Sequence, residues 1–393
     1  MKLQNRIFKM DNLDAVSFFN GLVFFSPVAL LVRTETGISV NDFFVLQALL
    51  SICIFVGEIP TGRLSDKLGH RNTLILSQLM LLFARVLLLA AFINKSMVLF
   101  VIEVFVEGMA ACFSSGTQSA YIYSVEPKET FVSKTAHVAN CGTAGFVIST
   151  ITYVFIYKFY GISGLLVATI LADLAAVIAS FGLRREVNTD KRQNCVMAGK
   201  CRTFKSVCNI KTVWIIVFLA SINIAYVLIN FFFVEKLMEI DISEVYMTPV
   251  ILGYSIIQLS SEFILNKVKT IEKNIVFVCS FFLAGLMLCF LGLLSDRIVI
   301  VAIMLVLPLV IDISTYLLDE VQNKVVDEQG NDKRRAEIIS IFNMGVNLVE
   351  IVFLFGSAYV ANLGTMVCFI VIGITTVSYT HLTLPTNSLV SIS

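Results

Sequence analysis

The sequence predicts an all-helical protein that is embedded in a membrane. Hydrophobic residues make up 57% of its 393 residues and charged residues only 15%, which is far from the composition of a water-soluble domain. Apolar segments of about 20 residues, the length needed to cross a bilayer, recur along the chain. Lys and Arg residues gather in alternate connections between these segments. With a net charge of +1 and no basic stripe, the sequence excludes a nucleic-acid-binding protein.

Eleven apolar segments of spanning length can be placed, and a shorter one follows them. The first six lie at about residues 12–33, 42–61, 72–93, 97–124, 133–157 and 161–182. The next five lie at about residues 212–234, 245–266, 274–294, 297–318 and 336–360. A last apolar run at 363–377 is too short to span comfortably. Residues 1–10 lead into the first segment without a cleavage site, so we expect that segment to stay as an anchor.

The positively charged residues predict the orientation. With the N-terminus in the cytoplasm, 23 of the 29 Lys and Arg residues fall in inside connections, and Arg85 lies within a helix. The five assigned to outside connections are Arg33, Lys95, Lys158, Lys236 and Arg297. Because Lys and Arg collect on the cytoplasmic side, we expect a multi-pass plasma-membrane protein with a cytoplasmic N-terminus.

Four parts follow from this pattern. Residues 1–182 form an N-terminal six-helix half, 183–211 a basic cytoplasmic linker, and 212–376 a C-terminal half. The linker is expected near anionic headgroups. Its three cysteines are read as reduced thiols, because their spacing and the lack of a nearby His do not fit a metal site; they are Cys195, Cys201 and Cys208. No metal and no cofactor are expected.

The fourth part is the tail, residues 377–393. The run from Val377 to Thr386 resembles the translation of a transposon-based sequencing adapter. We therefore expect a truncated gene, with the last helix cut within its span. The alternative is a genuine polar tail.

A charged decapeptide, Gly62–Arg71, separates the second and third apolar segments and is predicted to be a tight cytoplasmic loop. Its pattern is Gly-x-x-x-Asp-Lys-x-Gly-x-Arg, formed by Gly62, Asp66, Lys67, Gly69 and Arg71. This pattern resembles the loop signature of major facilitator superfamily transporters. The resemblance implies a twelve-helix fold made of two six-helix halves in parallel repeat.

An internal repeat accompanies the decapeptide. Two hundred residues later, Lys267 falls opposite Lys67 and Asn266 opposite Asp66. The copy is degraded, so we expect the N-terminal half to carry the function of the signature.

The resemblance implies that the decapeptide is a conformational latch, in which Asp66 holds the two halves together on the cytoplasmic side. A carboxylate is favoured beside Arg and at a helix N-terminus. The candidate partners of Asp66 are Arg63, Lys67 and Arg71. Gly62 would permit close helix contact, and Gly69 a turn with positive φ. Alternatively, the basic residues merely follow the charge rule for cytoplasmic connections.

Ionisable residues at membrane depth are candidates for proton coupling. Arg85, Glu103 and Glu107 are expected to meet at one depth, where two acids sharing one base would leave a carboxylate for a proton. The alternative is a purely structural ion cluster. Glu58 lies in a Glu-x-Pro-x-Gly run typical of drug-efflux members, and it either faces the central cavity or pairs with Arg63.

In this superfamily helices one, four, seven and ten line the cavity. The resemblance therefore makes polar residues on these helices candidates for substrate binding: Asp14, Asn20, Gln118, Asn223, Asn230 and Asp312. For a single Asn or Gln, an interhelical hydrogen bond is the alternative role.

Motifs point to efflux with two departures. Ser115-Gly116-Thr117 on the fourth helix is similar to a run in drug-efflux relatives. The first departure is Val104, which stands where proton-coupled exporters carry Arg. The second is the fifth helix, which keeps only the spaced glycines Gly142 and Gly145 of the antiporter motif.

We therefore expect a monomeric secondary transporter, not an enzyme, that exports small hydrophobic or amphipathic compounds by alternating access, driven by protons or another cation. Nutrient uptake by symport and a non-transporting membrane sensor or scaffold are the alternatives. The sequence contains no phosphate-binding Gly-x4-Gly-Lys loop, which argues against ATP-driven transport.

Overall fold

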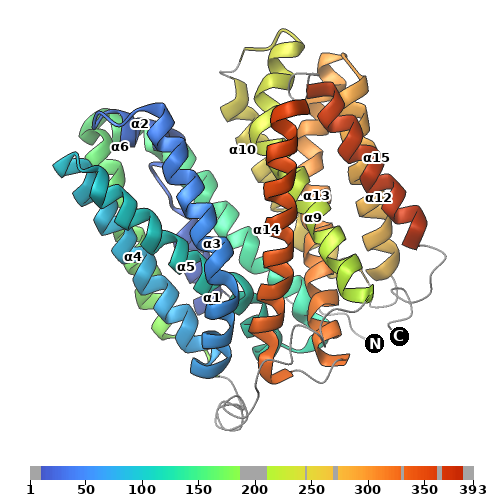
Figure 1. Ribbon diagram of the computed structural model, residues 1–393, viewed down its shortest axis with the longest axis horizontal. Helices are drawn as coiled ribbons and strands as arrows, with labels where there is room; N and C mark the ends of the chain where they lie inside the picture. The colour runs from blue at the N-terminus through green and yellow to red at the C-terminus, as the bar shows by residue number, and fades with distance from the viewer. Residues whose placement is uncertain are drawn as a thin grey trace. The chain divides into compact units, whose positions relative to one another are not determined.

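The computed structural model describes residues 10–185, 210–243, 246–268, 273–328, 332–360 and 365–383. In these ranges all regular structure is helical (Figure 1). Nine helices of the described part are long and apolar enough to cross a membrane. The three linker cysteines and residues 384–393 lie outside the described residues.

The N-terminal half begins with a broken helix. α1 (Asn12–Gly21) and α2 (Ala29–Thr34) are joined by the 3-10 turn η1 (Ser26–Val28). The following helices are α3 (Val40–Leu68), α4 (His70–Asn94), α5 (Met97–Val125) and α6 (Phe131–Phe181). Gly161, with a φ of 62°, breaks α6 where the sequence predicts two separate spans. A short 3-10 turn η2 (Lys128–Thr130) precedes α6.

The C-terminal half continues the series. Its helices are α9 (Ile210–Glu239), α10 (Met247–Gln258), α11 (Ser261–Lys267), α12 (Lys273–Leu293), α13 (Arg297–Glu328), α14 (Arg335–Val360) and α15 (Thr365–Thr383). Counted with α1–α2 and α10–α11 as one segment each and α6 as two, they correspond in order to the twelve expected helices.

Two compact units make up the chain. Unit 1 contains Met1–Lys200 together with Val325–Ile341, and unit 2 contains Cys201–Lys324 together with Phe342–Ser393. The end of α13 and the start of α14 therefore pack with the N-terminal helices.

The prediction of a loop at Gly62–Arg71 is wrong. α3 continues through Leu68, Gly69 ends it with a φ of 86°, and α4 begins at His70. With 29 residues, α3 is about 44 Å long at 1.5 Å per residue, which exceeds the roughly 30 Å hydrocarbon core. The charged residues from Gly62 to Leu68 therefore form the last turns of α3, which extends beyond the apolar segment. Hydropathy alone does not reveal such an extension.

Two other helix ends differ from the prediction for a similar reason. α13 runs ten residues further than residue 318, to Glu328, and α15 continues past Val377 to Thr383. Val377 is thus not the end of the last helix. The adapter-like origin of the tail stays a prediction.

α1 and the first half of α6 pack so closely that no side chain fits at the glycines between them. A Cβ atom on Gly21 would lie 2.0 Å from the carbonyl oxygen of Gly142, and one on Gly145 would lie 2.2 Å from that of Phe18. Small residues let helix backbones approach this closely within membranes. The two helices therefore form a rigid pair.

Candidate functional site

Asp66 binds the N-terminus of α14. Its carboxylate accepts hydrogen bonds from the backbone N–H groups of Ala336, at 3.1 Å, and Glu337, at 2.9 Å. These N–H groups belong to the first turn of α14, where no intrahelical acceptor is available and the helix dipole favours negative charge. The buried carboxylate therefore caps a helix that lies 270 residues later in the chain.

The glycines of the signature take the conformations that the sequence predicts. A Cβ on Gly62 would lie 2.7 Å from Ser340 Oγ and 2.9 Å from the carbonyl oxygen of Ala336, so α3 and the start of α14 are in direct contact. Gly69 occupies the positive-φ position between α3 and α4. The close approach at Gly62 therefore brings Asp66 to the α14 terminus.

The basic residues of the signature differ in their contacts. Arg63 Nε lies 2.6 Å from Glu337 Oε1. Arg71 donates to the carbonyl oxygens of Leu183, at 2.8 Å, and Phe181, at 2.6 Å, beyond the end of α6. Lys67 is exposed. Arg63 thus helps Asp66 to hold α14, and Arg71 joins α4 to the end of α6.

Glu58 is not the partner of Arg63. Its buried carboxylate accepts a hydrogen bond of 2.9 Å from Ser115 Oγ of α5. The pairing with Arg63 that the sequence left open is therefore wrong. The Glu-x-Pro-x-Gly run and the Ser-Gly-Thr run, which both suggested efflux, meet at this hydrogen bond.

A second acid, near the start of α14, escaped the sequence reasoning. Asp327 accepts hydrogen bonds from Tyr123 Oη at 2.8 Å and Lys128 Nζ at 2.5 Å, and it also pairs with Arg335. Asp327 lies at the end of α13 beyond residue 318, where the apolar pattern stops. Only the continued helix brings it to α5.

At membrane depth, Arg85 of α4 pairs with Glu107 of α5, with Nη1 2.9 Å from Oε1. Arg85 Nε also lies 3.7 Å from Asp173 Oδ2 of α6. Glu103, whose side chain is 0% exposed, lies 3.5 Å from Arg33 Nη2, and its carboxyl also contacts that of Glu107. The three residues predicted to meet are therefore brought together.

The structure corrects the composition of this cluster. Arg33 was assigned to an outside connection, but α2 runs to Thr34 and buries it. Asp173 was not recognised, although it is a solitary acid in an apolar segment, which is a usable signal. The cluster thus holds three acids and two bases: Glu103, Glu107, Asp173, Arg33 and Arg85.

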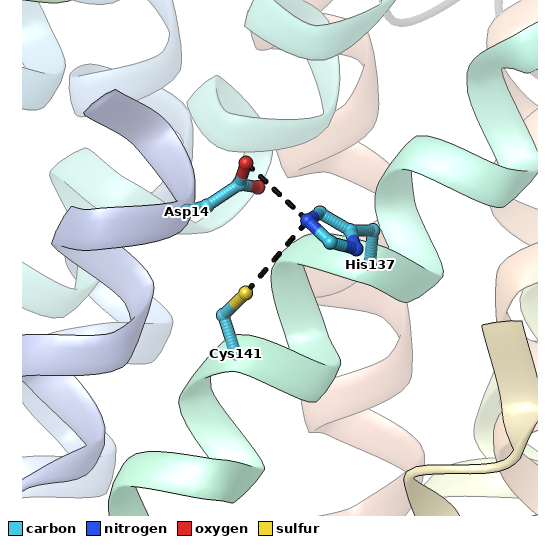
Figure 2. Close-up of side chains that lie close together, drawn as sticks. All are labelled: Asp14, His137 and Cys141. Atoms are coloured by element: carbon cyan, nitrogen blue, oxygen red, sulfur yellow. Dashed lines mark hydrogen bonds and ion pairs between the residues drawn. The ribbon is translucent and has the colours of Figure 1, made fainter. Parts of the chain in front are cut away.

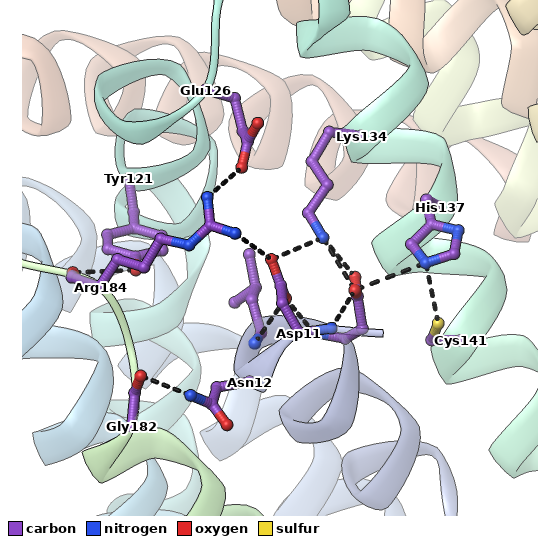
Figure 3. Close-up of polar contacts among 11 residues, drawn as sticks. Asp11, Asn12, Tyr121, Glu126, Lys134, His137, Cys141, Gly182 and Arg184 are labelled. Atoms are coloured by element: carbon purple, nitrogen blue, oxygen red, sulfur yellow. Dashed lines mark hydrogen bonds and ion pairs between the residues drawn. The ribbon is translucent and has the colours of Figure 1, made fainter. Parts of the chain in front are cut away.

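Asp14 lies in an ion network at the start of α1, and Figure 3 shows Asp11, Lys134 and Arg184 of this network. Asp11 and Asp14 form a capping box on α1. Lys134 Nζ lies 2.7 and 2.8 Å from the two Asp14 oxygens and 2.9 Å from Asp11 Oδ2. Arg184 Nη2 lies 4.0 Å from Asp11 Oδ2. Asp14 is 0% exposed and held by Lys134, so it is a poor substrate ligand.

Arg184 continues this network to the end of α5, where its Nη1 lies 3.2 Å from Glu126 Oε1 (Figure 3). Arg184, which follows α6, therefore forms ion pairs at the start of α1 and at the end of α5.

In unit 2, the acid predicted on α13 lies in a polar group. Asp312 accepts hydrogen bonds from Tyr226 of α9 and, at 2.9 Å, from Gln258 Nε2 of α10. Asn223 Nδ2 donates to Glu350 Oε2 of α14 at 2.6 Å. Gln258 was not predicted because it lies on α10, the eighth expected helix, outside the four that the resemblance assigns to the cavity. Tyr226 was not predicted because an aromatic residue on an apolar helix carries no distinguishing signal.

The remaining substrate candidates have few described contacts. Asn20 and Gln118 are half-buried, and the side chain of Asn230 lies outside the described residues. Their roles in substrate binding stay predictions.

Comparisons with known proteins agree on the fold. The sequence matches the family model described as Major Facilitator Superfamily over residues 14–319, and no curated protein matches it. The human organic anion transporter MFSD10 (TETRAN) superposes with a TM-score of 0.70 at 9% identity, covering 94% of this chain and 97% of that chain. A variant of the E. coli fucose:proton symporter FucP superposes with a TM-score of 0.73 at 11% identity and the same coverages, 94% and 97%.

FucP in its outward conformation gives a TM-score of 0.70 at 11% identity, again over 94% of this chain and 97% of that chain. Identities this low show a shared fold alone, but the family model spans most of the sequence. The chain therefore belongs to the major facilitator superfamily, a family of membrane transporters.

Proposed function

We propose that this transporter exports small hydrophobic or amphipathic compounds by alternating access, driven by the proton gradient. In this proposal it acts as a monomer in the plasma membrane with its N-terminus in the cytoplasm. The observation that carries the proton coupling is the buried cluster of Glu103, Glu107, Asp173, Arg33 and Arg85.

The cluster contains more acidic groups than basic groups. If every group is ionised, its three carboxylates and two guanidinium groups leave one negative charge inside the membrane. An uncompensated charge in this environment is costly. One bound proton makes the cluster neutral, so the excess carboxyl group is the expected protonation site.

The arrangement of the cluster also suits proton transfer along α5. Glu103 is the seventh residue of α5 and Glu107 the eleventh, which places them about 9 and 15 Å from the outer end of the helix at 1.5 Å per residue. Glu107 is the most accessible member, with a side chain 23% exposed. A proton could thus move between two neighbouring carboxyl groups along one helix face.

The direction of export rests on a different observation. Glu58 and Ser115, from the two runs that resemble drug-efflux transporters, are hydrogen-bonded to each other. MFSD10 is named an organic anion transporter and FucP a fucose:proton symporter, so the shared fold is compatible with either direction. Uptake by symport is the alternative that the transport experiment must exclude.

Asp66 completes the proposal as the conformational latch. Its two hydrogen bonds join the end of α3 to the start of α14, which both belong to unit 1. Release of these bonds would free α14 on the cytoplasmic side.

The test uses full-length protein in proteoliposomes with an imposed pH gradient and ethidium as a fluorescent amphipathic probe. We expect Glu103→Gln and Glu107→Gln to lose gradient-driven ethidium accumulation at least tenfold, while ethidium exchange without a gradient persists. Glu129→Gln is the matched control, because Glu129 is exposed on η2 and outside the cluster.

Four results would contradict the proposal. Undiminished gradient-driven transport in both cluster variants would remove the cluster from coupling. Accumulation of fucose or an organic anion in the direction of proton flow would indicate symport. Flux that depends on a gradient of another cation would show that this cation, and not the proton, drives transport. Absence of flux for every probe would favour a sensor or scaffold.

A further inference from the structure

A side-chain cluster outside the proposed transport residues has the composition of a metal site. Asp14 of α1 faces His137 and Cys141, which lie one turn apart on α6 (Figure 2). Carboxylate, imidazole and thiolate are the ligand types that bind Zn²⁺. We propose that Asp14, His137 and Cys141 form a binding site for a divalent ion of the Zn²⁺ class.

The distances between the ligand atoms are close to those around a tetrahedral ion. His137 Nε2 lies 3.4 Å from Asp14 Oδ2 and 4.0 Å from Cys141 Sγ, and the three ligand atoms all lie within 4.8 Å of one another. Bonds of about 2.0–2.3 Å around a tetrahedral zinc ion place neighbouring ligand atoms about 3.3–3.8 Å apart. Movement of Cys141 Sγ toward the other two ligand atoms would complete the geometry, with a fourth position for water.

The backbone holds these ligands in place. Asp14 lies in the capping box that begins α1, and the glycine contact between Gly21, Gly142 and Gly145 fixes α1 against α6. The spacing of His137 and Cys141 places both on one helix face. The site is therefore preorganised, and ion binding needs little rearrangement.

Lys134 is the obvious competitor for Asp14, and its position leaves room for a metal ion. The ammonium group contacts both Asp14 oxygens and also Asp11 Oδ2. With an ion on Asp14 Oδ2, Lys134 can keep its bonds to Asp14 Oδ1 and Asp11. Such a second contact to a ligating carboxylate orients it toward the metal.

The charges also balance when the ion is bound. Cys141 gives its thiol proton to water as the sulfur–metal bond forms, because a coordinating thiol is deprotonated. Asp11, Asp14 and the thiolate then carry three negative charges, which Lys134 and a divalent ion cancel. Arg184 and Glu126 pair with each other and add no net charge.

The ion has a route to the site. Asp14 is fully buried, but the side chain of His137 is 16% exposed and Cys141 is half-buried. The imidazole and thiol would bind first, and Asp14 would close the site. The sequence did not reveal it, because Asp14 lies 120 residues or more before its partners.

The test uses the full-length protein with Cys195, Cys201 and Cys208 replaced by Ser, since these linker thiols could bind metal themselves. Co²⁺ serves as the spectroscopic probe for Zn²⁺. We expect one Co²⁺ per protein, with a thiolate-to-cobalt absorption band. Cys141→Ser and His137→Ala should lose the band, whereas the matched control Cys279→Ser, at an exposed cysteine of α12, should retain it.

A second measurement guards against misfolded variants. In the unaltered site, Zn²⁺ should slow alkylation of Cys141 by N-ethylmaleimide at least tenfold, and Mg²⁺, which prefers oxygen ligands, should not. Asp14→Asn should reduce this protection. A band that survives Cys141→Ser, or a folded protein with neither band nor protection, would show that these residues form only an ion-pair network.

Discussion

At the scale of single residues, Asp66 shows how a sequence signature becomes a structural contact. Both oxygens of its carboxylate accept backbone N–H groups of α14. These donors would otherwise be buried without acceptors, because the first turn of a helix leaves its N–H groups unpaired. The contact therefore uses both the charge and the hydrogen-bonding capacity of the Asp66 side chain.

We predict that Asp66→Asn impairs transport without preventing membrane insertion. The substitution removes the charge and turns an amide NH₂ toward an N–H donor, which costs roughly 1–3 kcal/mol for a buried hydrogen bond to a charged group. Surface expression and transport rate would be measured together. Glu129→Gln is the control, since it makes the same change from carboxylate to amide at an exposed residue outside the signature. Equal flux in both variants would reject the latch.

At the scale of helices, the glycines between α1 and α6 determine how closely two elements can pack. The backbone atoms of Gly21 and Gly142 and those of Phe18 and Gly145 are in direct contact. This contact supports both the Asp14 network and the proposed ion site, because it sets the distance between α1 and α6.

We predict that Gly145→Ala lowers the thermal stability of the purified protein. Its Cβ would lie 2.2 Å from a backbone oxygen that cannot move aside without shifting α1, and overpacking of this kind costs about 1–3 kcal/mol. Gly253→Ala is the matched control, because there the only close atom is the terminal Cδ2 of Leu305 at 2.7 Å, which can rotate away. An unfolding temperature as high as that of the control would contradict this account.

At the scale of the whole molecule, the proposed orientation rests on the distribution of Lys and Arg and can be tested on α6. Glu129 precedes the first half of α6, and Lys158 lies near its end before the break at Gly161. The two exposed residues are 29 positions apart, or about 44 Å along a helix at 1.5 Å per residue. They should therefore lie on opposite sides of the membrane.

We predict that, in a cysteine-free background, Lys158→Cys reacts with a membrane-impermeant maleimide on intact cells. Glu129→Cys should react only after the membrane is permeabilised. Labelling of Glu129→Cys on intact cells, with Lys158→Cys protected, would reverse the proposed orientation.

The membrane class, the order of the helices and the superfamily could be predicted from sequence because they depend on local properties. Hydrophobic length, the spacing of Gly62, Asp66 and Gly69, and the distribution of Lys and Arg can be read within short segments. The helix boundaries were less accurate at α3 and α13, because a helix that continues into water loses its apolar signal without losing its hydrogen bonds.

Only the tertiary structure decided which polar residues meet. Asp66 lies 270 residues from the N–H of Ala336, and Lys134 lies 120 from Asp14. Arg33 became a member of the membrane cluster only because α2 continues far enough to bury it beside Glu103. Partners at such separations are set by helix packing, which sequence periodicity does not encode, so the pattern could identify the ionisable residues but not their pairing.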